Sequence, residues 1–256
     1  MSPDLNILIN ADDLGYSNPV NRAILHCFRQ GLIQSASLMT GMPAASAAIS
    51  MFKGSGFESS LGVHVNLTEG KPVSDFKIRK FLNQDGTWNK AVTTKSLLFL
   101  GSRSKKAFYK EISAQVQIAE DAGLIPSHIN SHHHVHTQPA FFPLFLKLGL
   151  EKGYPLRIAQ TYRSGSRLKG FYRDLINRRL RNEKAGFSAY FETLHSFLTD
   201  ANRFRTGTVE LMVHPVYSAD GSLTDSLDRQ GNDPVYKRFY EGGYPGTMKI
   251  KLNERV

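Results

Sequence analysis

The sequence predicts an α/β fold, a (β/α) barrel-like domain with parallel strands inside and helices outside. Short apolar segments typical of buried strands alternate with longer segments whose apolar residues recur at helical spacing. The chain has 256 residues, a length at which many α/β barrels fold as one domain. No Pro-, Gly- or Ser-rich linker divides the sequence, so we expect a single domain over residues 1–256.

Three strands are expected in the first part of the chain. Leu5–Asn10 is short and apolar, as in a buried strand, and Ser17-Asn18-Pro19 then begins a helix with a capping residue followed by proline. A second strand is expected at 32–40 and a second helix at 43–52. In Leu61–Thr68 apolar and polar residues alternate, which is the pattern of a strand with one apolar face.

The rest of the chain continues this alternation. Lys105–Ala122 is expected to be helical because Phe108, Ile112 and Val116 recur on one face. Further along, the expected elements are a histidine-rich strand at 127–136, a helix at 138–152, and strands at 156–159 and 208–214. Strands that alternate with helices in this order favour a parallel sheet, because the helices carry the chain back to the starting edge.

Composition excludes several classes of protein. The single cysteine, Cys27, rules out an internal disulfide framework and a cysteine-rich zinc site. No apolar run approaches the ~18 residues of a membrane span, and the first residues do not have the pattern of a secretory signal. We therefore expect a cytoplasmic protein.

The net charge of +10 comes largely from one segment, since residues 163–184 contain eight Lys or Arg and two acidic residues. Within it, apolar residues recur at helical spacing beside arginines over 168–181. Two interpretations stay open: an outer helix with its apolar stripe on the protein, or peripheral contact with the inner face of a membrane. Nucleic-acid binding is not expected, because interleaved aromatic residues and a known binding motif are lacking. A homodimer also stays open.

A run of histidines in the interior of the sequence, Ser131–His136, is the strongest indication of function. Four histidines fall in five positions, and imidazole is the commonest side-chain ligand of divalent metals. Other polar residues lie at or near the ends of expected strands, where sites form in parallel sheets. These candidates are Asp12, Asp13, His64, His132, Arg157 and His214.

An aspartate with two histidines makes a set of three metal ligands that leaves positions for water and substrate, as in catalytic sites. A second carboxylate beside the ligand can accept a proton from water, and a separate histidine can protonate a leaving group. These groups together suit the hydrolysis of an amide or an ester.

Five sequence motifs resemble those of the YdjC-like carbohydrate deacetylases, in the same order and over about residues 5–217. They are Asn10–Gly15, Gly62–His64, His128–His136, Leu156–Ile158 and Glu210–Pro215. The resemblance implies a barrel-like fold and metal-dependent removal of acetyl groups from N-acetylated sugars, either oligosaccharides or lipid-linked sugars.

The resemblance also implies roles for individual residues. His64 and His132 match metal-binding histidines, and Asp13 matches the carboxylate ligand. Asp12 would then be the base, His214 the acid, and Arg157 the residue that orients the Asp12 carboxylate. The implied cofactor is one divalent metal ion, for which Mg, Zn, Mn and Co all stay open.

Within the histidine run, strand alternation predicts that His132, His134 and His136 point to one side and His133 to the other. His132 is the expected ligand, so His134 and His136 are expected to face the substrate. Asn66 and Tyr16 are further candidates for substrate binding.

The sequence departs from the family pattern at three places. Leu14 stands where phenylalanine is usual, and Asn130 where aspartate is common, which affects the support of the histidines. Residues 218–256 form a divergent tail that is rich in Gly, Asp and Pro and shows no obvious final helix. Irregular or incomplete barrel closure is therefore expected at the C-terminal end.

Two other functions remain open from the sequence. One is a different metallohydrolase on the same scaffold, such as a phosphoesterase or another amidase. The other is a non-catalytic protein that binds a metal or a sugar at a membrane surface. The adjacent Asp12 and Asp13 argue against the second, because binding alone does not require a base beside a ligand.

Overall fold

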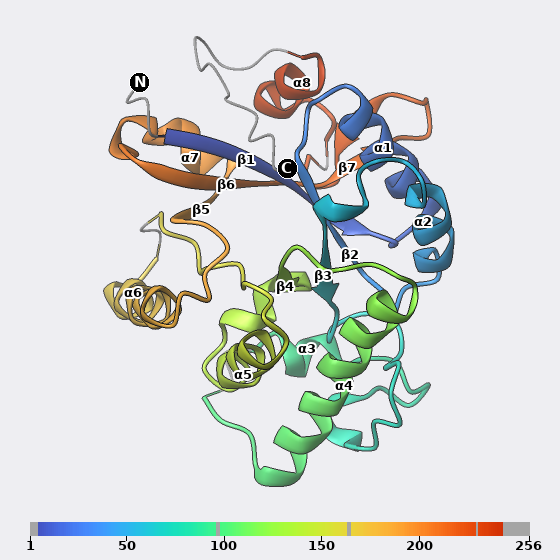
Figure 1. Cartoon of the computed structure of the whole chain (residues 1–256), viewed down its shortest axis with the longest axis vertical. Helices are drawn as coiled ribbons and strands as arrows, with labels where there is room; N and C mark the ends of the chain where they lie inside the picture. The colour runs from blue at the N-terminus through green and yellow to red at the C-terminus, as the bar shows by residue number, and fades with distance from the viewer. Residues whose placement is uncertain (1–4, 96–97, 163–164, 229, 243–256) are drawn as a thin grey trace.

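The computed structural model describes residues 5–95, 98–162, 165–228 and 230–242, and it confirms the predicted α/β barrel-like fold. Six parallel strands form one curled sheet in the order β4-β3-β2-β1-β6-β5, with helices around it (Figure 1). The strands are β1 (Leu5–Leu14), β2 (Ser35–Leu38), β3 (Leu61–Val65), β4 (Ile129–Ser131), β5 (Tyr190–Thr193) and β6 (Gly207–Val213). A separate antiparallel pair consists of β7 (Pro215–Tyr217) and β8 (Leu223–Asp225).

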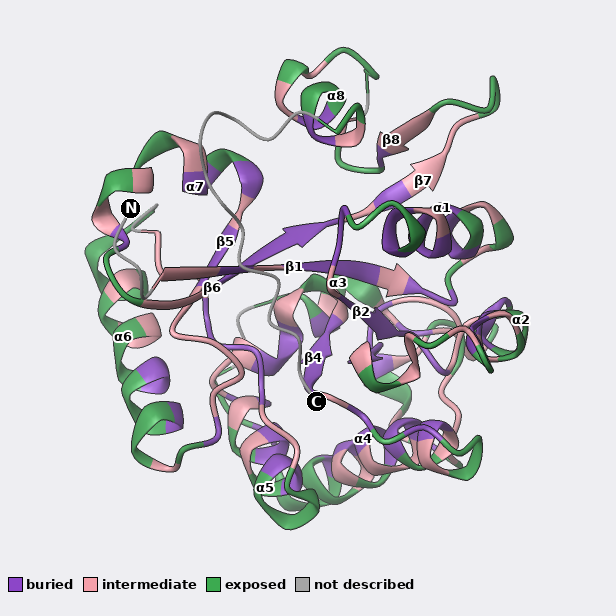
Figure 2. Ribbon diagram, turned by 45° about the horizontal axis from the view of Figure 1, so that its top comes forward, coloured by how far each residue is buried: buried purple, intermediate pink, exposed green. Residues whose placement is uncertain are grey.

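Eight α-helices lie within the described residues, and most of them carry both buried and exposed residues (Figure 2). They are α1 (Asn18–Arg29), α2 (Ala45–Phe52), α3 (Lys90–Thr93), α4 (Ser102–Asp121), α5 (Phe142–Lys152), α6 (Arg167–Asn182), α7 (Leu194–Thr199) and α8 (Pro234–Tyr240). Short 3₁₀ helices are η1 (Glu58–Ser60), η2 (Arg79–Phe81), η3 (His132–Thr137) and η4 (Ala201–Arg203). Among the described helices, none combines the length and apolar character needed to cross a membrane.

The central strand β1 organises the core, because it pairs in parallel with both β2 and β6. Its apolar residues Ile9 and Ala11 are fully buried. The helix that follows begins as its sequence predicts: the Ser17 side chain accepts from the backbone N–H of Val20, and Pro19 lies in the first turn. This arrangement fixes the carboxyl end of β1 at the centre of the sheet edge.

The prediction of a histidine strand over 127–136 is wrong beyond Ser131. β4 ends at Ser131, and the chain continues as the tight 3₁₀ helix η3. His133 and His134 both have φ of 53°, in the left-handed region. Strand alternation therefore does not decide which histidines point to the same side.

The predicted strand at 156–159 is reduced to isolated bridges, which join Leu156 to Ile129 on one side and to Gly186 on the other. The pairing stops because the Asn177 side chain on α6 binds both the N–H and the carbonyl of Ala159, at 2.8 and 2.9 Å. The irregular part of the barrel thus lies between the edge strands β4 and β5.

The described part of the tail is ordered around two elements. β8 pairs with β7, and α8 begins at Pro234 with Asp233 as its cap, whose side chain accepts from the Val235 N–H at 2.9 Å. The final helix that the sequence did not reveal is therefore α8. Residues 243–256 of the tail lie outside the described residues.

Candidate active site

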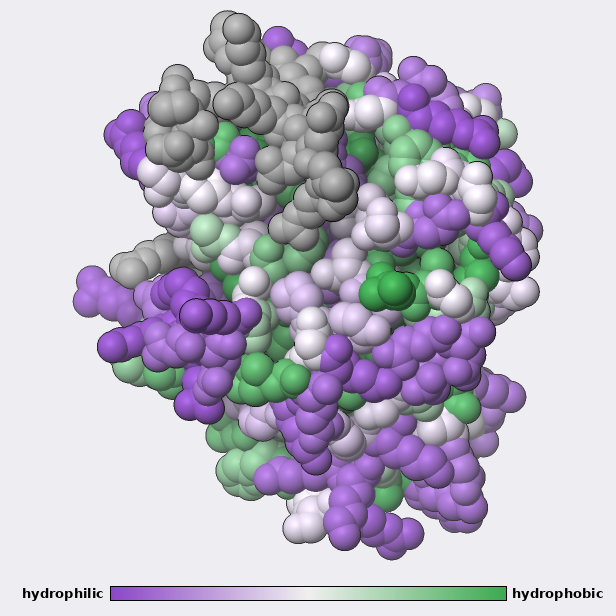
Figure 3. All heavy atoms as spheres, in the orientation of Figure 1, coloured by the Kyte–Doolittle hydropathy of each residue, from purple (hydrophilic) through white to green (hydrophobic). Residues whose placement is uncertain are grey.

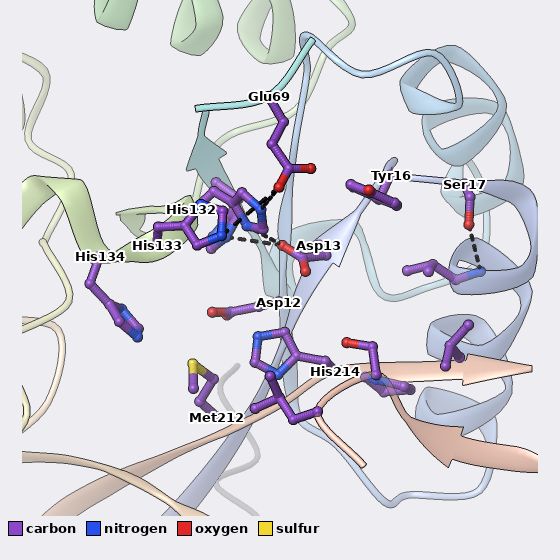
Figure 4. A pocket seen from close by; sticks show the side chains of 16 residues that line it. Asp12, Asp13, Tyr16, Ser17, Glu69, His132, His133, His134, Met212 and His214 are labelled. Atoms are coloured by element: carbon purple, nitrogen blue, oxygen red, sulfur yellow. Dashed lines mark hydrogen bonds and ion pairs between the residues drawn. The ribbon is translucent and has the colours of Figure 1, made fainter. Parts of the chain in front are cut away.

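Adjacent aspartates reach the same pocket because β1 is irregular at its carboxyl end. In a regular strand, neighbouring side chains point to opposite faces. The register of β1 against β2 shifts between Ala11 and Leu14, and Asp13 has φ of 68°. Aspartate tolerates this left-handed conformation better than most residues do. As a result, both Asp12 and Asp13 line the pocket (Figure 4).

Asp13, His64 and His132 converge from three different strand ends. Asp13 Oδ1 lies 3.2 Å from His64 Nε2 and 2.9 Å from His132 Nδ1. One ligand atom from each residue lies within 4.8 Å of the other two. Asp13 Oδ1 is buried, and none of the described residues gives it a hydrogen bond of good geometry. A divalent cation would satisfy this oxygen, and a carboxylate with two imidazoles is a donor set that suits zinc, manganese or cobalt.

Other side chains support each of the two histidines. His64 Nδ1 lies 2.6 Å from the Asn130 side chain and 3.2 Å from Ser37 Oγ. His132 Nε2 lies 3.6 Å from Glu69 Oε1. Metal-binding histidines commonly use the second ring nitrogen in this way, which fixes the ring and its proton.

The charge around His132 favours its protonated form when no cation is bound. Burial opposes protonation, but Asp13 and Glu69 outweigh it and raise the pKa of His132 to about 9. Contacts with His132 and Lys90 lower the pKa of Glu69 to about 2, although partial burial opposes this. A cation that binds here takes the place of the proton on His132.

A buried ion network holds Asp12. Arg157 donates to Asp12 Oδ2 at 2.6 Å and Oδ1 at 2.7 Å, and its Nε donates to Glu210 at 2.7 Å. All three residues are almost completely buried. Burial raises the pKa of the Asp12 carboxyl, but Arg157 reverses this and holds it far below its usual range. Burial raises the pKa of Glu210. Asp12 is therefore a fixed, ionised carboxylate.

His214 lies at the end of β6, across the pocket from the histidine turn (Figure 4). Asp225 on β8 accepts from the His214 backbone N–H at 2.8 Å, and its other oxygen lies 3.8 Å from the ring nitrogen Nδ1. Asp225 is buried and also accepts from Tyr240 at 2.8 Å. The tail thus supports the imidazole that faces the pocket.

The pocket brings together most of the residues that the sequence suggested. The predicted residues among its lining are Asp12, Asp13, Tyr16, His64, His132, His134 and His214. Tyr16 is 41% exposed, so it lies at the rim. His134 is half-buried, and desolvation together with Arg157 lowers its pKa to about 3, so it is a neutral imidazole. Arg157 lies behind the pocket and contacts it through Asp12.

Two residues proposed for substrate binding have other environments in the structure. His136 is 2% exposed, its Nδ1 lies 2.8 Å from Ser131 Oγ, and its ring packs on Phe145. Asn66 Oδ1 accepts from the N–H groups of Thr68 and Glu69, at 3.0 and 3.1 Å. Neither lines the described pocket, because the chain turns at η3 and because the Asn66 amide is used to shape the loop that carries Glu69.

Three supporting carboxylates were missed from the sequence. Glu210 could have been found, since it shares the parity of His214 along an otherwise apolar strand. Glu69 lies in a loop, and Asp225 lies in the tail beyond the last motif. Neither stands in a pattern that distinguishes it from a solvated surface carboxylate.

Comparison with known proteins decides the family. The sequence matches the family described as YdjC-like protein over residues 6–242. The chain belongs to the YdjC-like family. This match extends past Tyr217 and includes the β7–β8 pair and α8, and therefore Asp225.

Relatives cover most of this YdjC-like chain. A protein of Geobacillus stearothermophilus named carbohydrate deacetylase is 32% identical over 213 residues, which are 82% of this chain and 79% of the relative. A Brevibacillus brevis protein with the same name is 33% identical over 227 residues, 87% of this chain and 86% of the relative. A crystal structure of an Enterococcus faecalis protein has a TM-score of 0.66 and 21% identity, and the match covers 93% of this chain and 88% of that one. At this identity the crystal structure supports the fold alone.

Proposed function

We propose that this YdjC-like protein is a metal-dependent hydrolase that removes acetyl groups from N-acetylated sugars. The relatives named carbohydrate deacetylase support the reaction and the class of substrate. The observation that carries the proposal is the convergence of Asp13, His64 and His132, with a second carboxylate and a further histidine in the same pocket.

Asp13, His64 and His132 are the residues that would hold the metal ion. When bound, such an ion lowers the pKa of water to about 7 and polarises a carbonyl group. All three side chains line the pocket, in which an acetamido group would have to bind.

Asp12 would accept the proton of the attacking water. Its carboxylate is ionised at any working pH, because Arg157 stabilises the charge. Because the Arg157 charge stabilises the ionised carboxylate, Asp12 is a weak base. Proton transfer from water to Asp12 therefore contributes near the low end of the ~10²–10⁴-fold that is typical of general base catalysis. Arg157 also fixes the direction of the carboxylate, since it binds both oxygens.

His214 would donate a proton to the departing amine. Asp225 accepts a hydrogen bond from the backbone N–H of His214, which holds this histidine at the wall of the pocket. Tyr16 at the rim and the neutral His134 would contact the sugar. Tyr16 offers a ring face for stacking and a hydroxyl group for hydrogen bonding.

The test is acetate release from N-acetylated oligosaccharides by the purified protein, after chelation and after addition of zinc, manganese, cobalt or magnesium. Acetylated esters and phosphate esters belong in the same panel. Preferential turnover of a phosphate ester would assign a different metallohydrolase.

Variants connect this activity to the site. His64→Ala and His132→Ala should lose both metal binding and acetate release, whereas Asp12→Asn should keep metal binding and lose turnover by about 10²-fold or more. His195→Ala is the matched control, because His195 is an exposed histidine on α7 outside the pocket; its ring pairs with Asp233 at 2.8 Å, so circular dichroism checks that the fold is kept, and activity should equal that of the wild type. Full activity in both His64→Ala and His132→Ala would contradict the proposal.

A further inference from the structure

The outer face of α6 carries an apolar stripe that none of the described residues covers. Leu168, Phe171 and Leu175 are 78%, 69% and 55% exposed, whereas Ile176 and Leu180 on the opposite face are 3% and 1% exposed. The sequence suggested one apolar stripe over 168–181. The structure divides this stripe into two. Ile176 and Leu180 form a stripe that packs against the protein, whereas Leu168, Phe171 and Leu175 form a stripe that stays exposed.

Basic side chains surround the exposed stripe. The helix contains six basic residues and one acidic residue. Arg167, Lys169 and Arg178 are exposed, and Arg178 follows Leu175 by one turn. Figure 3 shows hydrophilic and hydrophobic side chains next to each other over α6. Leucine and phenylalanine on a helix face flanked by arginine and lysine are typical of helices that lie in a membrane interface.

The helix α6 contacts the end of the histidine turn. Tyr172 on α6 donates a hydrogen bond to the Thr137 carbonyl at the end of the histidine turn, at 3.0 Å. The helix begins after the segment that contains Arg157, so its first turns lie at the carboxyl edge of the sheet. The exposed stripe therefore lies on a helix that contacts the end of the histidine turn.

We propose that α6 docks the protein on an anionic lipid bilayer, with Leu168, Phe171 and Leu175 inserted among the lipids and the basic residues against the head groups. The charge favours this occupant over a second copy of the chain, because two such helices would bring like charges together. The stripe has one aromatic residue and two leucines, and the two leucines gain by immersion in lipid but offer no face for base stacking.

Docking requires no catalysis, so it is tested apart from the proposed function. The full-length protein is sedimented with vesicles of phosphatidylcholine alone and with vesicles that also contain phosphatidylglycerol. The wild type should bind the anionic vesicles and be released by salt. Absence of binding to anionic vesicles would overturn the proposal.

Two variants separate the apolar contribution from the electrostatic one. Leu168→Ser/Phe171→Ser/Leu175→Ser should lower the partition coefficient by about 100-fold, because three partly immersed side chains are lost. Arg167→Gln/Lys169→Gln/Arg178→Gln should lower it by a similar factor, at about fivefold for each charge, and should weaken the salt dependence. All six residues are exposed, so the fold is retained, which circular dichroism checks.

A matched control replaces three other exposed apolar residues. Leu98, Phe99 and Ile125 are 69%, 80% and 78% exposed and lie outside α6. Leu98→Ser/Phe99→Ser/Ile125→Ser should bind vesicles as the wild type does. Equal losses in this control and in the stripe variant would overturn the assignment to α6. Two other outcomes would overturn the proposal if the stripe variant bound vesicles as the wild type does. One is a dimer of the wild type that the stripe variant no longer forms. The other is oligonucleotide binding that the stripe variant loses.

Fluorescence provides an independent measurement of insertion. The single tryptophan, Trp88, is 2% exposed and packs in an aromatic cluster with Phe76 and Phe108, so its emission should not change on docking. In Phe171→Trp, the added indole should shift its emission to the blue with anionic vesicles and become accessible to quenchers in the lipid. Emission that does not change on addition of vesicles that bind the protein would refute insertion at this position.

Discussion

Asn130 limits how well His64 can bind a cation, and Asn130→Asp should therefore tighten metal binding. Asn130 is fully buried between His64 and Arg157. With Nε2 of His64 on a metal, the ring proton lies on Nδ1, which is 2.6 Å from one end of the Asn130 amide. The other end lies 3.0–3.2 Å from two guanidinium nitrogens of Arg157.

Both neighbours are then donors, but an amide has one acceptor end. If Oδ1 faces His64, then Nδ2 faces Arg157; if Oδ1 accepts from Arg157, Nδ2 faces the His64 nitrogen. A buried donor without an acceptor costs about 1–3 kcal/mol. The carboxylate of Asn130→Asp accepts from both sides, so metal affinity should rise by about 10–100-fold, the range known for such supporting contacts.

The assay is competition for zinc or manganese against a chromogenic chelator, at fixed pH. The metal-free Asn130→Asp protein should melt at a lower temperature than the wild type, because the new carboxylate is buried and the oxygen that faces His64 would lie 3.2 Å from the Val63 carbonyl oxygen. Asn130→Leu is the control for loss of the amide alone and should not bind metal more tightly. Equal or weaker affinity in Asn130→Asp than in the wild type would refute the reasoning.

Three further changes test the supporting network. Glu69→Gln should weaken metal binding by about 10–100-fold, because the carboxylate beside His132 is lost; calorimetric titration measures this, and unchanged affinity would contradict it. Arg157→Met should lower the free energy of unfolding in urea by about 3–5 kcal/mol, because two buried carboxylates lose their partner; a loss below 1 kcal/mol would argue against the network. His128 is buried with a pKa lowered from 6.5 to about 3, mainly by burial, so the stability it supports is present above pH ~6.5 and is lost as pH falls toward 3. Between pH 7 and 5 the free energy of unfolding of the wild type should therefore fall by about 2 kcal/mol more than that of His128→Gln. Equal decreases in the two proteins would show that His128 does not cause this pH dependence.

The alternation of strands and helices around a parallel sheet could be predicted from the sequence, because apolar residues recur at different spacings in the two, although β5 was not expected. The carboxyl ends of parallel strands share one edge, so Asp13, His64 and His132 were expected to meet although they are far apart in sequence. The structure brings these residues together. Arg157 and His214 followed from the same argument.

The shape of the histidine run could not be predicted in this way. Alternation assumes an extended chain, whereas His133 and His134 adopt left-handed conformations that the surrounding structure imposes. Glu69 and Asp225 were missed for a related reason. Each acts through a partner that is distant in sequence, and such partnerships arise from tertiary contacts that leave no local pattern.

The irregular end of β1 separates the stability of the fold from its chemistry. A deletion of one residue between Ala11 and Leu14 would restore regular pairing with β2, but the deleted residue would be Asp12 or Asp13, because no other residue lies there. The resulting protein could be as well folded as the wild type, yet it would lack one of its two acidic groups. Selection for thermal stability alone would therefore tend to remove this bulge, and only selection for activity would preserve it.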